Sequence, residues 1–230
     1  MKTQKYLVAA AVVSVAGVAQ TTMADAILSF GYTDLSGQYV GDVLGGLFTA
    51  RASSLGAIQT SGDVTRLVPS GVGTATFNTG FEGGLDASDA VFNISVFDKT
   101  ANRAMGLGEF VLTDIDGDTI SGTIDGIWVR GSQGRTFFNG NLRNVVLTDN
   151  GLQDNTFNGN DGAFQISGLG GPQPVLEGAL VQLFIRTGVG FFDVSFFNNS
   201  TQVSGEIVPT PGAVALAGLA GIAALRRRRA

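Results

Sequence analysis

The chain has 230 residues and contains neither histidine nor cysteine. Their absence excludes disulfide bonds, zinc sites built from histidine or cysteine, and nucleophile systems that need an imidazole or a thiol; catalysis by paired carboxylates is still open. The formal net charge is −5, but six of the 14 basic residues lie in the two terminal segments, so the middle of the chain is far more acidic than the whole.

The first 26 residues have the layout of a secretory signal peptide. Lys2 and Lys5 precede an apolar run at 6–19, and small residues follow at Ala24 and Ala26. Charged, apolar and small-residue regions in this order direct a chain to export. We predict cleavage after Ala26, with Ala24 as the alternative site. An uncleaved N-terminal anchor is the other reading of the same run.

Residues 27–207 predict one exported all-β domain. This part carries 18 acidic and 8 basic residues, a net charge of −10, which disfavours nucleic acid and anionic membranes as partners. About 180 residues can bury a sufficient core without disulfides. Strands are expected at 27–32, 38–49, 63–68, 74–77, 90–97, 108–113, 119–130, 136–147, 163–166, 179–186 and 191–208.

Turn chemistry between these segments indicates antiparallel pairing. Asp116-Gly117, Asn150-Gly151, Asn158-Gly159 and Asp161-Gly162 are dipeptides that favour the turns of β-hairpins. Many short strands with such punctuation predict a single antiparallel β-sandwich of jelly-roll type, with a barrel as the alternative.

Three acids at alternate positions are the candidate metal ligands. Asp114, Asp116 and Asp118 resemble the start of an EF-hand calcium loop, with Asp125 twelfth in the series. Thr119 stands at the sixth position, where that loop requires glycine, and a plain hairpin turn accounts for the same residues. We expect no cofactor, with Ca²⁺ as the alternative. The stretch 111–114 (Val-Leu-Thr-Asp) recurs at 146–149, which predicts two similar strand-to-turn corners.

Two phenylalanine pairs have two interpretations. Phe191-Phe192 and Phe196-Phe197 are consistent with an exposed aromatic platform for carbohydrate, or with packing in the core. We expect core packing. No residues are assigned as catalytic.

The last 23 residues form a third segment. Its motif is Val208, Pro209, Thr210 and Pro211, and an apolar run at 212–225 and a basic cluster of Arg226, Arg227, Arg228 and Arg229 follow. Prolines lack the backbone donor that a sheet needs, so we expect the sheet to end before them and the motif to be open to a protease.

The apolar run predicts a short helix. Its length would be about 21 Å, against a hydrocarbon core of roughly 30 Å, so it suits transient insertion better than permanent anchoring. The arginines oppose translocation and would keep the end of the chain in the cytoplasm. A permanent tail anchor and a buried C-terminal helix are the alternatives.

This tail, about a tenth of the chain, resembles the PEP-CTERM sorting domain of bacterial exosortase substrates, a tail that is also catalogued as an ice-binding protein C-terminal domain. The family usually has glutamate where this chain has Thr210, so either the main exosortase type or a variant could be the partner. The resemblance implies export, recognition of the tail by a membrane-embedded protease or transpeptidase of the exosortase type, removal of the helix, and release or attachment at the cell surface.

Together these features predict an exported, surface-delivered protein without enzymatic activity, with a structural or adhesive role in the envelope or extracellular matrix. The expected partners are the exosortase, the inner membrane at least transiently through the helix, and, as a further candidate, an extracellular polysaccharide. A carbohydrate-binding module and a carboxylate-dependent glycosidase are the alternative functions.

Overall fold

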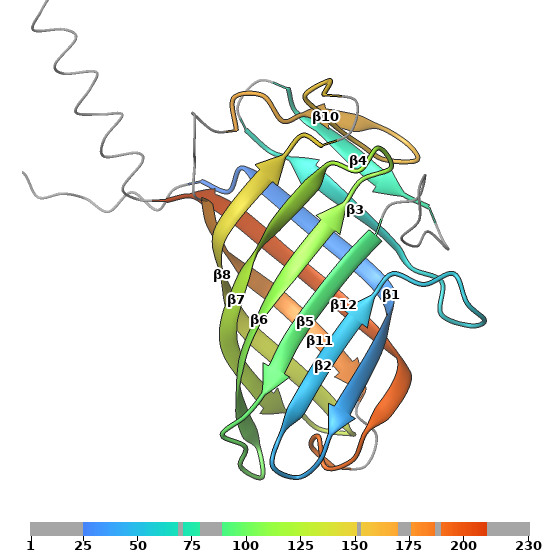
Figure 1. Ribbon diagram of the computed structural model, residues 1–230, viewed down its shortest axis with the longest axis vertical. Coiled ribbons are helices and arrows are strands. Elements are labelled where there is room, and N and C mark those ends of the chain that lie inside the picture. The colour runs from blue at the N-terminus through green and yellow to red at the C-terminus, as the bar shows by residue number, and fades with distance from the viewer. Residues whose placement is uncertain are drawn as a thin grey trace, which may run out of the picture.

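The computed structural model describes residues 25–68, 71–78, 89–150, 153–169, 176–186 and 190–210. Their regular structure is entirely β-strand, in one large antiparallel sheet and one small hairpin sheet (Figure 1). The strands are β1 (Leu28–Gly41), β2 (Gly46–Arg51), β3 (Ser61–Arg66), β4 (Gly73–Phe77), β5 (Asp89–Val96), β6 (Arg103–Thr113), β7 (Thr119–Arg130), β8 (Arg135–Thr148), β9 (Thr156–Asn158), β10 (Ala163–Gln165), β11 (Leu176–Arg186) and β12 (Phe196–Pro209).

The alternation seen in the sequence explains which face of each strand is buried. In β5, Ala90, Phe92, Ile94 and Val96 are buried and their neighbours are half-exposed. Successive side chains of a strand point to opposite faces, so one apolar face turns inward along its whole length. The prediction of an all-β, antiparallel fold is confirmed.

Strand β1 closes the large sheet on itself. On one side it pairs with β12 along most of its length, from Leu28 opposite Ile207 to Tyr39 opposite Phe196. On the other side its first half pairs with β3 and its second half with β2. Strands β1, β2, β5, β6, β7, β8, β11 and β12 therefore form a continuous ring (Figure 1).

The strand order differs from the jelly roll that the sequence predicts. Strands β5 to β8 are neighbours both in the chain and in the sheet, and so are β11 and β12. A jelly roll instead needs long connections between strands that are distant in sequence. Short turns, such as the one at Asp116-Gly117 between β6 and β7, let each strand pair with the next strand in the sequence, so no long connection is needed.

Two hairpins outside the ring, β3–β4 and β9–β10, pack together at one of its ends. Thr76 of β4 forms an isolated bridge with Asp161, and the buried Arg66 guanidinium of β3 donates hydrogen bonds to the carbonyls of Gln165 and Ser167. Burial lowers the pKa of Arg66, and the two carbonyl acceptors compensate for part of its lost hydration. Arg66 thus connects the two hairpins.

Aromatic side chains fill the interior of the ring. Phe30 of β1 stacks on Phe92 and Phe110, with ring centroids 6.3 and 6.1 Å away. Further along the axis of the closed sheet, the centroid of the Trp128 side chain lies 4.7 Å from that of Phe138 and 5.0 Å from that of Phe192. All six rings are buried, so burial of aromatic surface in place of disulfides stabilises this fold.

A row of three glycines makes room for one of these rings. Gly106, Gly126 and Gly140 are paired across β6, β7 and β8, and a Cβ atom at any of them would lie within 2.7 Å of the Phe138 ring. Real Cβ contacts are essentially never that short. The glycines therefore let Phe138 lie flat against the wall of the ring.

The two ends of the domain meet at one end of the ring, which we call the terminal pole. The Ile27 N–H donates to the Ile207 carbonyl at 2.8 Å, and the Ile27 carbonyl accepts from the Leu67 N–H at 2.8 Å. Strands β6 and β8 also end at this pole. The opposite end, the far pole, carries the turns that join β1 to β2, β5 to β6 and β7 to β8 and the connection from β11 to β12.

Candidate functional site

The repeated Val-Leu-Thr-Asp corners lie side by side at the terminal pole. Thr113 at the end of β6 pairs with Thr119 of β7, and Thr119 pairs with Thr148 at the end of β8. Asp114 and Asp149, the next residue in each corner, therefore begin neighbouring loops. The two corners therefore lie at the same end of neighbouring strands, but only the first is a hairpin turn, because the chain after Asp149 continues to β9.

Asp114 organises the turn between β6 and β7. Its carboxylate accepts the N–H groups of Asp116 at 2.9 Å, Asp118 at 2.8 Å and Asn158 at 2.7 Å, and the side chain is buried. Burial raises the pKa of Asp114, an effect that the three N–H donors partly oppose. The turn itself needs the positive φ of Gly117, 97°.

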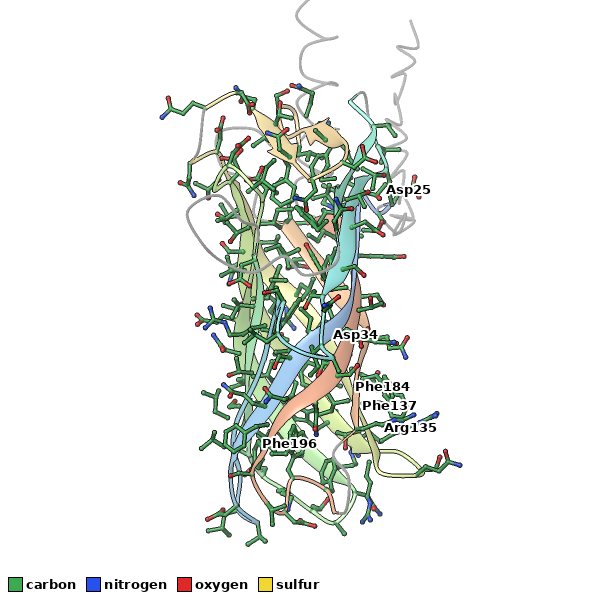
Figure 2. The ribbon with its side chains drawn as sticks, turned by 90° about the vertical axis from the view of Figure 1, so that its right-hand side faces the viewer. Asp25, Asp34, Arg135, Phe137, Phe184 and Phe196 are labelled. Carbon is green, nitrogen blue, oxygen red and sulfur yellow. The ribbon has the colours of Figure 1, made fainter. Side chains whose placement is uncertain are left out.

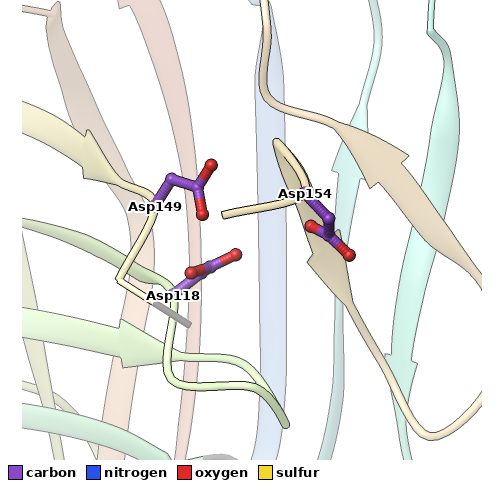
Figure 3. Close-up of side chains that lie close together, drawn as sticks. All are labelled: Asp118, Asp149 and Asp154. Atoms are coloured by element: carbon purple, nitrogen blue, oxygen red, sulfur yellow. The ribbon is translucent and has the colours of Figure 1, made fainter. Parts of the chain in front are cut away.

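The predicted metal ligands do not converge on one point. The carboxylates of Asp114 and Asp116 both face Asn158, because Asp116 accepts the Asn158 Nδ2–H at 2.7 Å while Asp114 accepts its backbone N–H. Asp118 instead belongs to a different group, with Asp149 and Asp154 from the loop after β8 (Figure 3). Of the three alternating acids, Asp114 and Asp116 therefore stabilise the hairpin turn, whereas Asp118 contacts the loop after β8.

The group of Asp118, Asp149 and Asp154 is the candidate metal centre of the described residues. One carboxylate oxygen from each lies within 4.8 Å of the other two, and their exposure increases from buried Asp118 to exposed Asp154. Each carboxylate also accepts a backbone N–H from the segment that follows β8: Asn150 donates to Asp118, Asn155 to Asp149 and Thr156 to Asp154.

Chemically, this group offers oxygen ligands alone, which suit a hard cation such as Ca²⁺. Ca²⁺ takes six to eight oxygens, so three carboxylates would have to be supplemented by carbonyls or water. Asp149 Oδ1 is buried without a hydrogen-bond partner among the described residues. Sequence reasoning missed Asp149 and Asp154 as members of this group; the repeat at 146–149 was the signal that could have found Asp149.

The phenylalanine pairs occupy the far pole, and three of the four rings belong to the core. Phe191 and Phe192 are buried at 1% exposure, and Phe196 is half-buried against the core. Phe197 is 59% exposed. The expectation of core packing is confirmed for the first three rings and is wrong for Phe197.

The sequence-predicted sorting residues are only partly described. Val208 and Pro209 lie in β12, where they pair with Glu177 and Leu176, so the sheet continues one residue further than the prolines predict. A terminal position tolerates proline because the missing donor interrupts no further pairing. Thr210 follows the strand, and Pro211, the predicted helix at 212–225 and the cluster at 226–229 lie outside the described residues.

At the other end of the chain, Ala24 also lies outside the described residues, and Ala26 directly precedes the hydrogen-bonded Ile27. Among the described residues, no helix is long and apolar enough to span a membrane. Comparison with models of protein families, with curated proteins and with solved structures finds no match to this chain.

Proposed function

We propose that this chain is an exported bacterial protein that is delivered to the cell surface and has a structural or adhesive role there, without catalysing a reaction. The observation that carries the proposal is the meeting of its two ends. Ile27 and Ile207 are hydrogen-bonded neighbours, so the segments read as a signal peptide and a sorting tail leave the domain at the same pole. One membrane can then hold both segments during export.

In this proposal the sorting enzyme cuts beside the last strand. Val208 and Pro209 are the last two residues of β12 and Thr210 follows the ladder, so the end of the sheet falls within the motif. The apolar run and the arginines beyond it would keep the precursor in the inner membrane until an exosortase-type protease or transpeptidase removes them. The product is then released or attached at the surface.

The packing of the domain supports a role through its surface. We describe the closed sheet as a β-sandwich, with β5 to β8 as one layer and β11, β12 and β1 as the other, joined at both edges. Phe30 of one layer stacks on Phe92 and Phe110 of the other. Because aromatic rings occupy the space between the layers, a partner has to bind on the outside or at the poles.

Processing of the precursor tests the proposal. In a host that has the cognate exosortase, mass spectrometry of the surface-exposed protein should find a chain that lacks both residues 1–26 and residues 212–230. Substituting Pro209 and Pro211 with alanine should leave an uncut, membrane-associated precursor, and replacing Arg226–Arg229 with glutamine should impair retention and processing.

Two controls separate sorting from folding. Thr210→Glu restores the residue usual in the resembled family and should be processed at least as well as the wild type. Deleting the exosortase gene should reproduce the uncut precursor. A mature surface protein that still ends in Ala230 would overturn the proposal and identify a permanent tail anchor.

A further inference from the structure

A groove runs along the outer wall of the ring near the far pole. It has a volume of about 350 Å³ and lies between β11 and the start of β12. Its lining combines one aromatic ring, one guanidinium and several amide and hydroxyl groups: Phe184, Arg186, Asn198, Asn199, Ser200 and Gln202. This composition differs from the apolar interior and from the acidic terminal pole.

A cation and two rings extend this groove across the neighbouring strand. Phe137 of β8 pairs with Phe184 of β11, with ring centroids 5.6 Å apart, and the Arg135 guanidinium carbon lies 5.6 Å from the Phe184 centroid (Figure 2). Both rings are half-buried on the outside of the sheet. They therefore present a fixed aromatic surface beside a positive charge.

Two arginines occupy paired positions of neighbouring strands at this point. Arg135 pairs with Arg186 across the β8–β11 ladder, and neither has an ion-pair partner among the described residues. Directly opposed like charges destabilise a sheet. They lie at the far pole, which carries five of the eight basic residues of the domain: Lys99, Arg103, Arg130, Arg135 and Arg186. A pair of unpaired cations beside a groove favours an anionic ligand.

A bulge in β12 shapes the end of the groove. Gly37 pairs with Asn199 and Tyr39 with Phe196, so Phe197 and Asn198 together oppose one residue of β1. Asn198 has a φ of 56°, and its Oδ1 accepts the Ser36 hydroxyl at 3.2 Å. Bulges re-aim side chains, and here the bulge accompanies an exposed Phe197 beside an amide that lines the groove.

Donors for a polar ligand remain available in this groove. Among the described residues, the Asn198 Nδ2 and the Gln202 amide make no hydrogen bond, whereas Asn199 Nδ2 donates to the Arg186 carbonyl at 2.6 Å. Amides of this kind can bind sugar hydroxyls, and aromatic rings can pack against the apolar face of a sugar. The two guanidinium groups provide the forked donors that match carboxylates.

We propose that this outer groove binds an acidic polysaccharide whose units carry carboxylates, such as a polyuronate. Arg135 and Arg186 bind the carboxylates, the amides bind hydroxyl groups, and Phe137 and Phe184 contact the sugar rings. The net charge of −10 opposes any polyanion at long range, so binding depends on the local pair of cations and on the contacts with hydroxyl groups and sugar rings that nucleic acid and an anionic membrane surface do not offer in this form. The biological use of this site rests on the proposed surface location, but the binding itself does not.

Binding of the purified full-length chain in non-ionic detergent tests the proposal. The probes are an oligogalacturonate, a neutral glucan of equal length, single-stranded DNA and phosphatidylglycerol vesicles. We expect selective binding of the oligogalacturonate that weakens as salt increases. Arg135→Gln with Arg186→Gln should weaken it roughly tenfold or more, because each guanidinium loses charge-assisted hydrogen bonds.

Matched variants guard against trivial losses. Arg51→Gln with Arg143→Gln removes the same charge away from the far pole and should change affinity less than about twofold. Phe184→Leu keeps apolar bulk but removes the ring, and should weaken binding while the melting temperature shows that the chain is folded.

Several results would overturn the proposal: no binding of oligogalacturonate, equal binding of the neutral glucan, equal binding of DNA or vesicles, or equal losses in the two double-arginine variants. Processing of the tail is measured separately, so an intact C-terminus would remove the sorting proposal and leave the groove unaffected.

Discussion

Gly106→Ala tests the packing of Phe138 against the glycine row. The new Cβ would lie 2.6 Å from Phe138 Cε2, 2.8 Å from Trp128 Nε1 and 3.0 Å from Ile94 Cγ2. All three are side-chain atoms of a filled interior, so the rings must shift to accept the methyl group. Overpacking of this kind should lower the free energy of unfolding by about 2 kcal/mol and the melting temperature by roughly 4–8 °C.

A double-mutant cycle makes this prediction specific. Phe138→Ala alone should cost about 3–5 kcal/mol, but the Gly106→Ala methyl then enters the space that the ring has left. The double variant should therefore be less destabilised than the sum of the single variants by about 1 kcal/mol or more. Additive losses would refute the proposed contact between residue 106 and the Phe138 ring.

The assay is urea unfolding followed by the fluorescence of Trp128, which is the only tryptophan of the chain and lies against Phe138. Gly31→Ala is the matched control. Gly31 is also in a strand, but a Cβ there would meet nothing within 4 Å, so the change should stay within about 0.5 kcal/mol.

Three further predictions concern the acidic corners. Asp114→Ala leaves three backbone N–H groups without their acceptor and should lower the free energy of unfolding, measured with denaturant, by about 2–4 kcal/mol. Asp116→Ala loses one side-chain hydrogen bond and should lower it by less than about 1 kcal/mol. Equal losses would contradict these roles. Burial raises the pKa of the Asp114 carboxyl above 3.8, so the native state binds the carboxyl proton more tightly than the unfolded chain does. The free energy of unfolding, compared with that of Asp114→Asn, should therefore be greatest below about pH 4 and decline as the pH rises through the raised pKa. A constant difference between the two proteins from about pH 3 to 7 would count against this prediction. Ca²⁺ at about 5 mM should shift the melting temperature by less than about 1 °C, because Asp118, Asp149 and Asp154 each already accept a backbone N–H and one oxygen from each falls short of the roughly six to eight that Ca²⁺ takes. A rise of several degrees that Asp149→Asn abolishes would identify a metal site.

Local patterns predict the strands well where both faces have a distinct character. The predicted segment 119–130 coincides with β7, and 90–97 differs from β5 by one residue at each end. Two predicted strand boundaries are wrong because apolar residues also occur in turns and connections. The segment predicted at 38–49 contains the turn between β1 and β2, and the one predicted at 191–208 begins with two phenylalanines that pack into the core from the connection before β12.

Closure of the sheet depends on information that local patterns do not carry. Periodicity identifies the buried face of a strand, but it does not show whether the first and last strands of a sheet are paired with each other. Here β1 pairs with β12, so the two ends of the sheet are joined. The acidic group is similar: Asp118 was visible in the sequence as one of three alternating acids, but its neighbours Asp149 and Asp154 come from a loop more than thirty positions away.

The pairing of the first strand with the last also fixes an order of events. The ring can close only when Leu28 of β1 pairs with Ile207 of β12, and contacts between residues so far apart in sequence form slowly. During the export proposed above, β12 is the last strand to cross the membrane, and the sorting motif starts within it. The ring would then close at about the time when the tail reaches the sorting enzyme. A chain whose ring has not yet closed would still be held in the membrane by its tail at the moment of cleavage.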